Sequence, residues 1–409
     1  MGEENMTKTT TKALMAAAAF SVAAPALAET ELNFWSWRQE DIAGYEAIIA
    51  EFEKTHPDIH IVYTPHEAKA YNTILTTALA GGSGPDIIHT RAYGSLENIS
   101  SAGYLEPLDG QVDLSLLSKD ELLGTTLRSD GKVYAVPFAS QTVVVYYNKD
   151  IFDAQGITPP ETFEEFKAVA AHLKDAGITP LANGTADGWT IEVMSGAFMP
   201  NFYGSDFFGQ VTSGATDFED PRYVTALGKM AELAEFMPVG FEGVDYATMK
   251  ALFTSGAAAM FVGGSWEING FRDAGLNFDM MPGPSAEAGG ERMVATWMDG
   301  GYAVNAASPN KEAALEFIRF TATTPFAQML TDQLNNIPAV DGAVSSDPML
   351  QKVASFHSAA TPYIMLVAFR FNKPTGSTLL QTGLQELMTG AKDAATVAKD
   401  ISDGIKNAE

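Results

Sequence analysis

The sequence predicts an α/β protein built from two lobes. Strand and helix signals alternate along the chain, an order typical of α/β folds. The chain has 409 residues, and a single hydrophobic core stops growing at roughly 250–300 residues, so a second core is expected. No internal repeat or low-complexity linker separates two halves. The two lobes are therefore expected to share the chain through short crossing segments.

The N-terminal segment has the three parts of a secretory signal peptide. Two lysines precede an apolar run over residues 13–24, and the small residues Ala26-Leu27-Ala28 follow it. The run has about a dozen residues, against the ~20 needed to cross a bilayer, so a membrane anchor is disfavoured. We expect residues 1–28 to be a signal peptide that is cleaved on export.

The cysteine content indicates the compartment of the protein, and its net charge disfavours some classes of partner. The chain has no cysteine, so it can form no disulfide and lacks the cysteine that anchors a bacterial lipoprotein. We therefore expect a freely diffusing, monomeric protein of the periplasm. Its formal net charge of −26 would repel nucleic acid and anionic membranes.

The first half of the chain shows its elements in order. A strand is expected at 32–35, and apolar residues at helical spacing follow it over 45–52. A second strand follows the break at Pro57, and residues 71–80 indicate a helix closed by two glycines. The segment "DIIHT" at 86–90 indicates a buried strand.

Capping signals and one long apolar run mark the elements that follow. Ser118 to Glu121 and Thr162 to Glu165 each fit a capping box, which predicts two helix starts. The run "TVVVYYN" over 142–148 predicts a strand covered on both faces.

Sequence motifs for catalysis or for a bound cofactor are missing. The glycine cluster "GGSGPD" precedes a strand, whereas phosphate-binding loops lie between a strand and a following helix. The histidines are scattered, so neither a metal nor another cofactor is expected. Asp86, Glu267 and Asp299 could form a glycosidase pair, but their separation in sequence is not diagnostic. The turn residue Asp86 is expected to cap backbone amides instead.

Four stretches carry a resemblance to a known family: "PDII", "GKVYAVPFASQTVVVYYNKDIF", "LFTSGAAAMFVGGSWE" and "VNAASPNKEAALEFI". They are similar to bacterial ABC-transporter extracellular solute-binding proteins of family 1, the maltose-binding-protein type. The resemblance implies a periplasmic-binding-protein type II fold, with two α/β lobes joined by a three-segment hinge. It places the lobes at 29–138 plus 284–337 and at 139–283 plus 338–409.

The resemblance also implies the positions of the three crossings and the function. The crossings would fall near 137–141, 280–284 and 337–340. Between the lobes the protein would hold a di- or oligosaccharide or a glycoside and deliver it to a membrane ABC permease with its cytoplasmic ATPase. It would not be an enzyme. Clefts between domains are favoured ligand sites, which agrees with this placement.

Several site residues follow from matching the family's motifs. The tryptophan of "GSW" matches Trp266, whose family role is to stack on a sugar ring, and Trp189 matches a second stacking aromatic. Gln141 replaces an acidic residue that bonds sugar hydroxyls in the maltose binder, which puts maltose itself in doubt. The opening strand carries "WSWRQ", residues 35–39, in place of an Asp-Lys pair. Arg91 follows the "PDII" strand and is expected to contact the ligand.

The residue types agree with a carbohydrate site. A sugar offers an apolar C–H face and an edge of hydroxyls, so it needs aromatic platforms and planar side chains with paired hydrogen-bonding atoms. We expect at least one of Trp35 and Trp37 in the cleft. The complete predicted set is Trp35, Trp37, Arg38, Gln39, Arg91, Gln141, Trp189, Trp266, Trp297, Asp299, Gly300 and Arg370.

Other interpretations stay open from the sequence. Tryptophans more often pack in cores, and the arginines could form surface ion pairs. One or two arginines could instead clamp an acidic group of the ligand. The protein could also bind a non-sugar or acidic small solute on the same fold, or be a secreted glycosidase.

Overall fold

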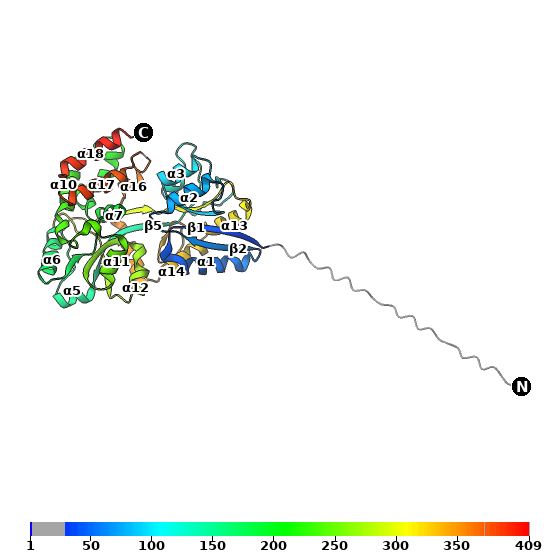
Figure 1. The fold of residues 1–409 in the computed structure, drawn as a ribbon, viewed down its shortest axis with the longest axis horizontal. Coiled ribbons are helices and arrows are strands. Elements are labelled where there is room, and N and C mark those ends of the chain that lie inside the picture. The colour runs from blue at the N-terminus through cyan, green and yellow to red at the C-terminus, as the bar shows by residue number, and fades with distance from the viewer. Residues whose placement is uncertain (2–28, 372, 409) are drawn as a thin grey trace.

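The computed structural model describes residues 1, 29–371 and 373–408 (Figure 1). The predicted signal peptide, after its first residue, lies outside the described residues. Figure 1 shows two bodies, each with strands and surrounding helices, and strand β5 (Ala139–Asn148) runs between them. The predicted α/β fold with two lobes is confirmed.

The first body is built on a five-stranded sheet with the order β2-β1-β3-β10-β4. Strand β1 is parallel to both β2 and β3, and β10 is antiparallel to β3 and β4. In β1, Leu32 and Phe34 point into the core and alternate with exposed residues, as the strand period requires. The strands are β1 (Thr30–Ser36), β2 (Ile59–Pro65), β3 (Ile87–Thr90), β4 (Val136–Pro137) and β10 (Gly301–Val304).

Helices cover both faces of this sheet. Helix α1 (Ile42–Thr55) buries Tyr45, Ile48, Ile49 and Phe52 at the predicted helical spacing. Ser118 forms the predicted capping box with Glu121. The other helices of this body are α2 (Tyr71–Ala80), α3 (Gly94–Ser100), α4 (Lys119–Leu122), α13 (Lys311–Thr321) and α14 (Thr324–Leu334), with short 3₁₀ turns η1 (Gln39–Asp41) and η2 (Leu123–Thr125).

The second body is built around β5, which the predicted apolar run forms. The strand order is β12-β9-β5-β7-β6, and β8 and β11 also pair with β5. All residues of β7 and nearly all of β5 are buried, as expected for a sheet covered on both faces. The other strands are β6 (Thr179–Leu181), β7 (Ala258–Gly264), β8 (Phe278–Met281), β9 (Val294–Met298), β11 (Ile337–Pro338) and β12 (Ala360–Pro362).

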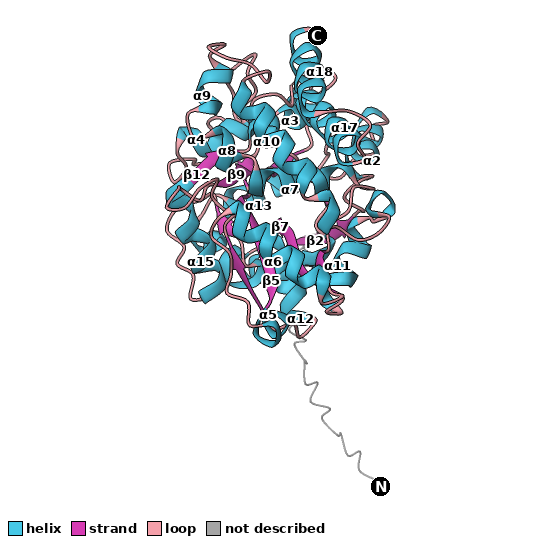
Figure 2. Ribbon diagram, turned by 90° about the vertical axis from the view of Figure 1, so that its left-hand side faces the viewer, coloured by secondary structure: helices cyan, strands magenta, loops and turns pink. Residues whose placement is uncertain are grey.

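The second body carries most of the helices that the structure describes. Thr162 and Glu165 form the predicted capping box at the start of α6. In Figure 2, α17 and α18 lie at one end of this body and α5 and α12 at the other. The helices are α5 (Lys149–Gln155), α6 (Phe163–Asp175), α7 (Gly188–Phe198), α8 (Pro200–Tyr203), α9 (Phe207–Thr212), α10 (Pro221–Glu232), α11 (Tyr246–Thr254), α12 (Ile268–Asp273), α15 (Pro348–Phe356), α16 (Ile364–Val367), α17 (Gly376–Met388) and α18 (Ala394–Lys406), with η3 (Ala234–Phe236), η4 (Phe241–Gly243), η5 (Ser265–Glu267) and η6 (His357–Ala359).

The chain passes between the two sheets where strands of one body continue into the other. Strand β4 ends in the first sheet at Pro137, and β5 begins the second sheet at Ala139. A later crossing runs from β9 to β10, at 298–301, because β9 pairs with β5 and β10 with β3. This differs from the predicted position near 280–284. The lobe division stays a prediction, and the pairing favours residues 284–298 as part of the second lobe.

Within the described residues, no helix combines the length and the apolar character needed to cross a membrane.

Candidate ligand-binding site

A cavity of about 350 Å³ lies between the two bodies and is lined by side chains from both. Its size falls within the range of small-molecule sites, roughly 300–1,000 Å³. Four of the five tryptophans of the chain line it. They are Trp37, Trp189, Trp266 and Trp297, which come from the end of β1, the start of α7, η5 and β9.

Two tryptophans of the second body keep part of their surface uncovered, whereas Trp297 is buried. Trp266 and Trp189 are half-buried. The Trp266 ring lies 5.9 Å from that of Trp297 at an angle of 67°, and the Trp189 ring lies 4.7 Å from Tyr246. Gly264 allows the Trp266 position, because a Cβ atom there would lie 1.8 Å from the indole.

Glu267 fixes the orientation of two of these rings. Its Oε1 accepts hydrogen bonds from the indole Nε1 of Trp266 at 2.8 Å and from the hydroxyl of Tyr246 at 2.5 Å. Its Oε2 lies 3.3 Å from the ammonium of Lys250. Burial raises the pKa of Glu267. The carboxylate therefore supports the aromatic wall and does not face the cavity.

Trp37 is covered by two neighbours. The guanidinium of Arg91 lies 4.0 Å from its ring centre, and the ring of His89 lies 4.1 Å away. His89 is fully buried, and burial lowers its pKa well below the usual value, so it is neutral at pH 7. Trp37 is only 4% exposed. It serves mainly as a support for Arg91 and presents little free ring to the cavity.

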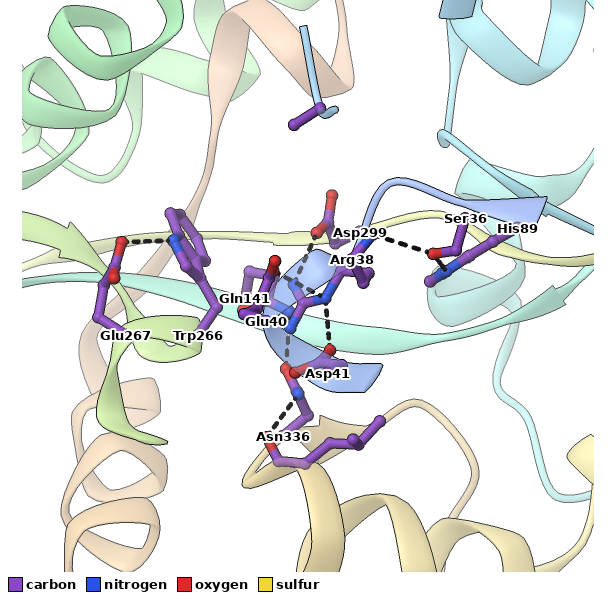
Figure 3. Close-up of polar contacts among 12 residues, drawn as sticks. Ser36, Arg38, Glu40, Asp41, His89, Gln141, Trp266, Glu267, Asp299 and Asn336 are labelled. Atoms are coloured by element: carbon purple, nitrogen blue, oxygen red, sulfur yellow. Dashed lines mark hydrogen bonds and ion pairs between the residues drawn. The ribbon is translucent and has the colours of Figure 1, made fainter. Parts of the chain in front are cut away.

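Arg38 is the centre of a buried charge cluster at the end of β1 (Figure 3). Its Nε donates to Asp41 Oδ2 at 2.6 Å and lies 3.2 Å from Glu40 Oε1. Its Nη1 lies 3.8 Å from Asp299 Oδ2. Burial raises the pKa of Asp41 to about 6, against the opposing charge of Arg38. Among the described residues, the Nη2 of Arg38 has no hydrogen-bond partner.

Two further carboxylates line the same cavity, one in the crossing segment between β9 and β10 and one in the second body. Asp299 Oδ1 accepts a hydrogen bond from the Trp297 indole at 3.3 Å. Glu192, on α7, accepts from the Gln381 amide at 2.6 Å through Oε2. Its Oε1 is buried without a partner in the described part of the chain, and burial raises its pKa.

The sequence comparison settles the family. A model of the family described as bacterial extracellular solute-binding protein matches residues 36–327. The chain belongs to this family. The predicted resemblance is confirmed, and because the family is extracellular the protein is an exported one.

Similar proteins add detail to the family assignment. The chain is 26% identical over 315 residues to the maltotriose-binding protein of Pyrococcus abyssi, covering 75% of this chain and 66% of that protein. It is 26% identical over 360 residues to the galactooligosaccharide-binding protein of Bacillus subtilis, covering 85% and 80%.

Solved structures of the same fold cover nearly the whole chain. A chitin oligosaccharide binding protein superposes with a TM-score of 0.78 at 22% identity and covers 93% of this chain and 99% of its own. The GacH receptor of Streptomyces glaucescens GLA.O superposes with a TM-score of 0.78 at 22% identity and covers 93% and 100%. At this identity the likeness shows the fold.

Within this solute-binding protein, eight of the predicted site residues line the cavity. They come from both bodies, which supports the prediction that the site lies between lobes. They are Trp37, Arg38, Arg91, Trp189, Trp266, Trp297, Asp299 and Arg370.

The structure places the other four predicted residues outside the cavity. Trp35 is half-buried with its ring against His66 at 4.7 Å, and Gln39 is exposed on η1. Gly300 has φ +93°, and a Cβ there would lie 2.0 Å from the carbonyl oxygen of Thr90. Its small size is needed for strand packing.

Gln141 is fully buried in a network that we name the hinge network, comprising Gln141, Ser265 and Asn336. Figure 3 shows Gln141 and Asn336 of this network. Its amide nitrogen donates to Asn336 Oδ1 at 2.8 Å, and its amide oxygen accepts from the Ser265 hydroxyl at 2.9 Å. Both of its polar atoms are thus committed to the protein. The structure places Gln141 next to β11 and η5, away from the ligand space.

The cavity also contains residues that the sequence did not indicate. Glu192 could have been identified from the sequence, because it is the one ionisable residue in the apolar segment "GWTIEVMSGAF" of α7. The others are brought in by folding and have no local signature. The additional lining residues are Glu40, Ala68, Lys69, Asn72, Asp187, Gly188, Glu192, Tyr246, Leu366 and Gln381.

Proposed function

We propose that this protein is the periplasmic carbohydrate receptor of an ABC importer. It captures a di- or oligosaccharide or a glycoside between its lobes and delivers it, unaltered, to the membrane permease and its ATPase. A cleaved signal peptide exports it, and it acts as a monomer. The relatives from Pyrococcus abyssi and Bacillus subtilis are named as maltotriose-binding and galactooligosaccharide-binding proteins, which supports a carbohydrate as the ligand.

The observation that carries the proposal is the tryptophan lining of the cavity. Three tryptophans of the second body face it, and two of them are half-buried. An uncovered indole face at a protein surface loses the benefit of burial unless a ligand covers it. A pyranose ring, with its C–H face, is a ligand of the right shape.

Two buried polar atoms of residues that line the cavity have no hydrogen-bond partner in the part of the chain that the structure describes. Arg38 Nη2 is a hydrogen-bond donor, and Glu192 Oε1 is an acceptor. A buried polar atom left without a partner costs about 1–3 kcal/mol. A sugar hydroxyl can both donate and accept, so the hydroxyl edge of one ligand can satisfy both atoms.

Binding between two lobes supplies the coupling to transport. Each lobe alone carries part of the site, so a ligand that touches both favours the closed arrangement by its differential affinity. A micromolar dissociation constant corresponds to about −8 kcal/mol. Two or three stacked aromatic side chains and several charged hydrogen bonds can provide that after closure costs.

Calorimetric titration with a panel of oligosaccharides and glycosides tests the proposal. We expect at least one saturable ligand, recovered chemically unchanged after prolonged incubation. Released monosaccharide in that incubation would indicate a glycosidase instead. Binding confined to non-sugar solutes, such as peptides or organic acids, would contradict the carbohydrate assignment.

A further inference from the structure

Two guanidinium groups in the cavity have no carboxylate at ion-pairing distance among the described residues: those of Arg91 and Arg370. Arg91 stacks on Trp37 and donates from Nη2 to the carbonyl oxygen of Ala68 at 3.3 Å. Arg370 is half-buried on the opposite lobe. The two lie close enough that the charge of Arg370 acts to lower the pKa of Arg91.

Each carboxylate that lines the cavity already contacts another side chain. Asp187 lies 3.0 Å from the ammonium of Lys69. Glu40 and Asp299 both lie against Arg38. Glu192 receives the neutral amide of Gln381. Neither Arg91 nor Arg370 forms an ion pair with the described residues, and their nearest counter-charges, Asp299 for Arg91 and Glu192 for Arg370, act beyond ion-pairing distance.

Arg91 is half-buried, and a guanidinium that is partly removed from water without an ion pair is disfavoured in its charged form. Burial, the largest effect, lowers its pKa to about 10, while Asp299 opposes the shift from a greater distance. The group still carries its charge at neutral pH. Two such groups facing one space favour a ligand that brings a negative charge there.

On the basis of the proposed function, we propose that the ligand is an acidic carbohydrate whose carboxylate binds between Arg91 and Arg370. A guanidinium is planar and offers paired N–H donors that match the two oxygens of a carboxylate. The tryptophans would hold the ring, and Glu192 Oε1 and Arg38 Nη2 would take its hydroxyls. A uronic-acid residue carries a carboxylate, a sugar ring and hydroxyl groups in one molecule.

Two opposing effects act over different distances. The chain carries a formal charge of −26, which disfavours an approaching anion. In physiological salt, this field is largely screened beyond about 8 Å, whereas a direct guanidinium–carboxylate contact is not. Glu192 and Asp299 are nearby carboxylates that could repel the anion. Burial raises the pKa of Glu192 and the Gln381 amide binds one of its oxygens, while Asp299 lies 3.8 Å from Arg38 and accepts a hydrogen bond from Trp297. The local contact therefore outweighs the distant charge.

Matched pairs of ligands test this inference by calorimetry. The pairs are digalacturonic acid with its methyl ester, and cellobiouronic acid with cellobiose. We expect the acid of at least one pair to bind ten-fold or more tightly than its neutral partner. In the R370Q and R91Q variants, we expect that preference to fall below three-fold. R319Q is the matched control, because Arg319 lies outside the cavity and pairs with Glu312 and Glu316.

The outcomes separate this inference from the proposed function. Neutral sugars that bind as tightly as the acids, or more tightly, would overturn the acidic ligand and leave the carbohydrate receptor intact. A failure of both acidic and neutral sugars to bind would overturn both. An acid preference that persists in R91Q and R370Q would show that other groups hold the carboxylate and would overturn the assignment.

Discussion

At the residue scale, the neighbours of a side chain decide its role more than its type does. Trp35 and Trp37 are two positions apart in the same segment. Trp37 lines the cavity beneath Arg91, whereas Trp35 packs against His66. Trp266 lies over Gly264 and is held by its own hydrogen bond to Glu267, so its remaining face is positioned without help from a ligand. Such preorganisation lowers the entropy cost of binding.

Truncation of Trp266 tests its part in binding. Trp266→Ala should weaken ligand binding by about 2 kcal/mol, or roughly thirty-fold, because it removes a half-buried aromatic ring from the cavity wall. Calorimetry with the tightest-binding sugar measures the change. Trp35→Ala is the control, and it should leave the affinity within three-fold. Equal losses in the two variants would contradict this assignment.

Asp41 should give the protein a distinctive pH dependence. Its pKa rises from 3.8 in the unfolded chain to about 6 in the folded protein, chiefly through burial. Between these values the folded state keeps a proton that the unfolded chain has lost, so the free energy of unfolding contributed by this group falls as pH rises. It is fully present below pH 4 and lost above pH 6.

The measurement is urea unfolding at several pH values, compared with Asp41→Asn. The stability of the wild-type protein relative to this variant should fall by on the order of 2 kcal/mol between pH 4 and pH 6. Glu46→Gln, which changes an exposed carboxylate of α1, should show no such slope. A difference that stays constant or grows over this range would refute the assignment to Asp41.

At the element scale, β5 joins the two bodies and carries the hinge network. Its first residues pair with β9 and β11, and its later residues pair with β7 and β8. Gln141 lies where these pairings change and links η5 to the segment before β11. The amide therefore ties together three chain segments at the junction of the lobes.

Replacement of Gln141 separates a hinge role from a ligand role. Gln141→Leu leaves Ser265 Oγ and Asn336 Oδ1 buried without this partner, which should lower the free energy of unfolding by about 1–3 kcal/mol. Urea unfolding measures the loss, and Gln39→Leu, at an exposed glutamine, should change stability by less than 0.5 kcal/mol. Unchanged stability together with a large loss of affinity would show that Gln141 takes part in ligand binding and would contradict the hinge role.

At the scale of the whole molecule, several contacts join the two bodies around the cavity. Lys69 pairs with Asp187, and the guanidinium of Arg128 lies 3.5 Å from the ring centre of Phe371. Gly94, the first residue of α3, approaches the carbonyl of Arg370 so closely that a Cβ would lie 2.1 Å from its oxygen. The exposed ion pair contributes little. The backbone contact at Gly94 is the one that tolerates no added atom.

A methyl group at Gly94 should therefore favour an open arrangement. Gly94→Ala is expected to weaken ligand binding at least ten-fold, although Gly94 does not line the cavity, because the lobes can no longer approach to this distance. Small-angle scattering with saturating ligand should show a larger radius of gyration than for the wild type. Gly228→Ala is the control, since a Cβ there meets no atom within 4 Å. Wild-type affinity in Gly94→Ala would exclude this contact from closure.

The sequence alone was sufficient for what depends on near neighbours along the chain. The apolar run of β5, the helical spacing of α1 and the capping boxes at Ser118 and Thr162 all formed as predicted. The family motifs placed most of the cavity tryptophans because those residues follow recognisable glycines and strand ends. The later crossing was predicted near 280–284, whereas the strand pairing puts it at 298–301, because the pairing of β5 with β9 is a long-range contact that local sequence does not specify.

Folding settled which polar side chains face the ligand space. Nothing near Gln141 or Gly300 in sequence shows that Asn336 and Thr90 would lie against them. Tyr246 and Gln381 reach the cavity from helices remote in the chain. Periodicity specifies the face of an element that is buried, but the partner that covers that face comes from distant segments. Burial and ion pairing are decided once those segments have met, so the sequence alone could not show that Arg91 forms no ion pair with the described residues.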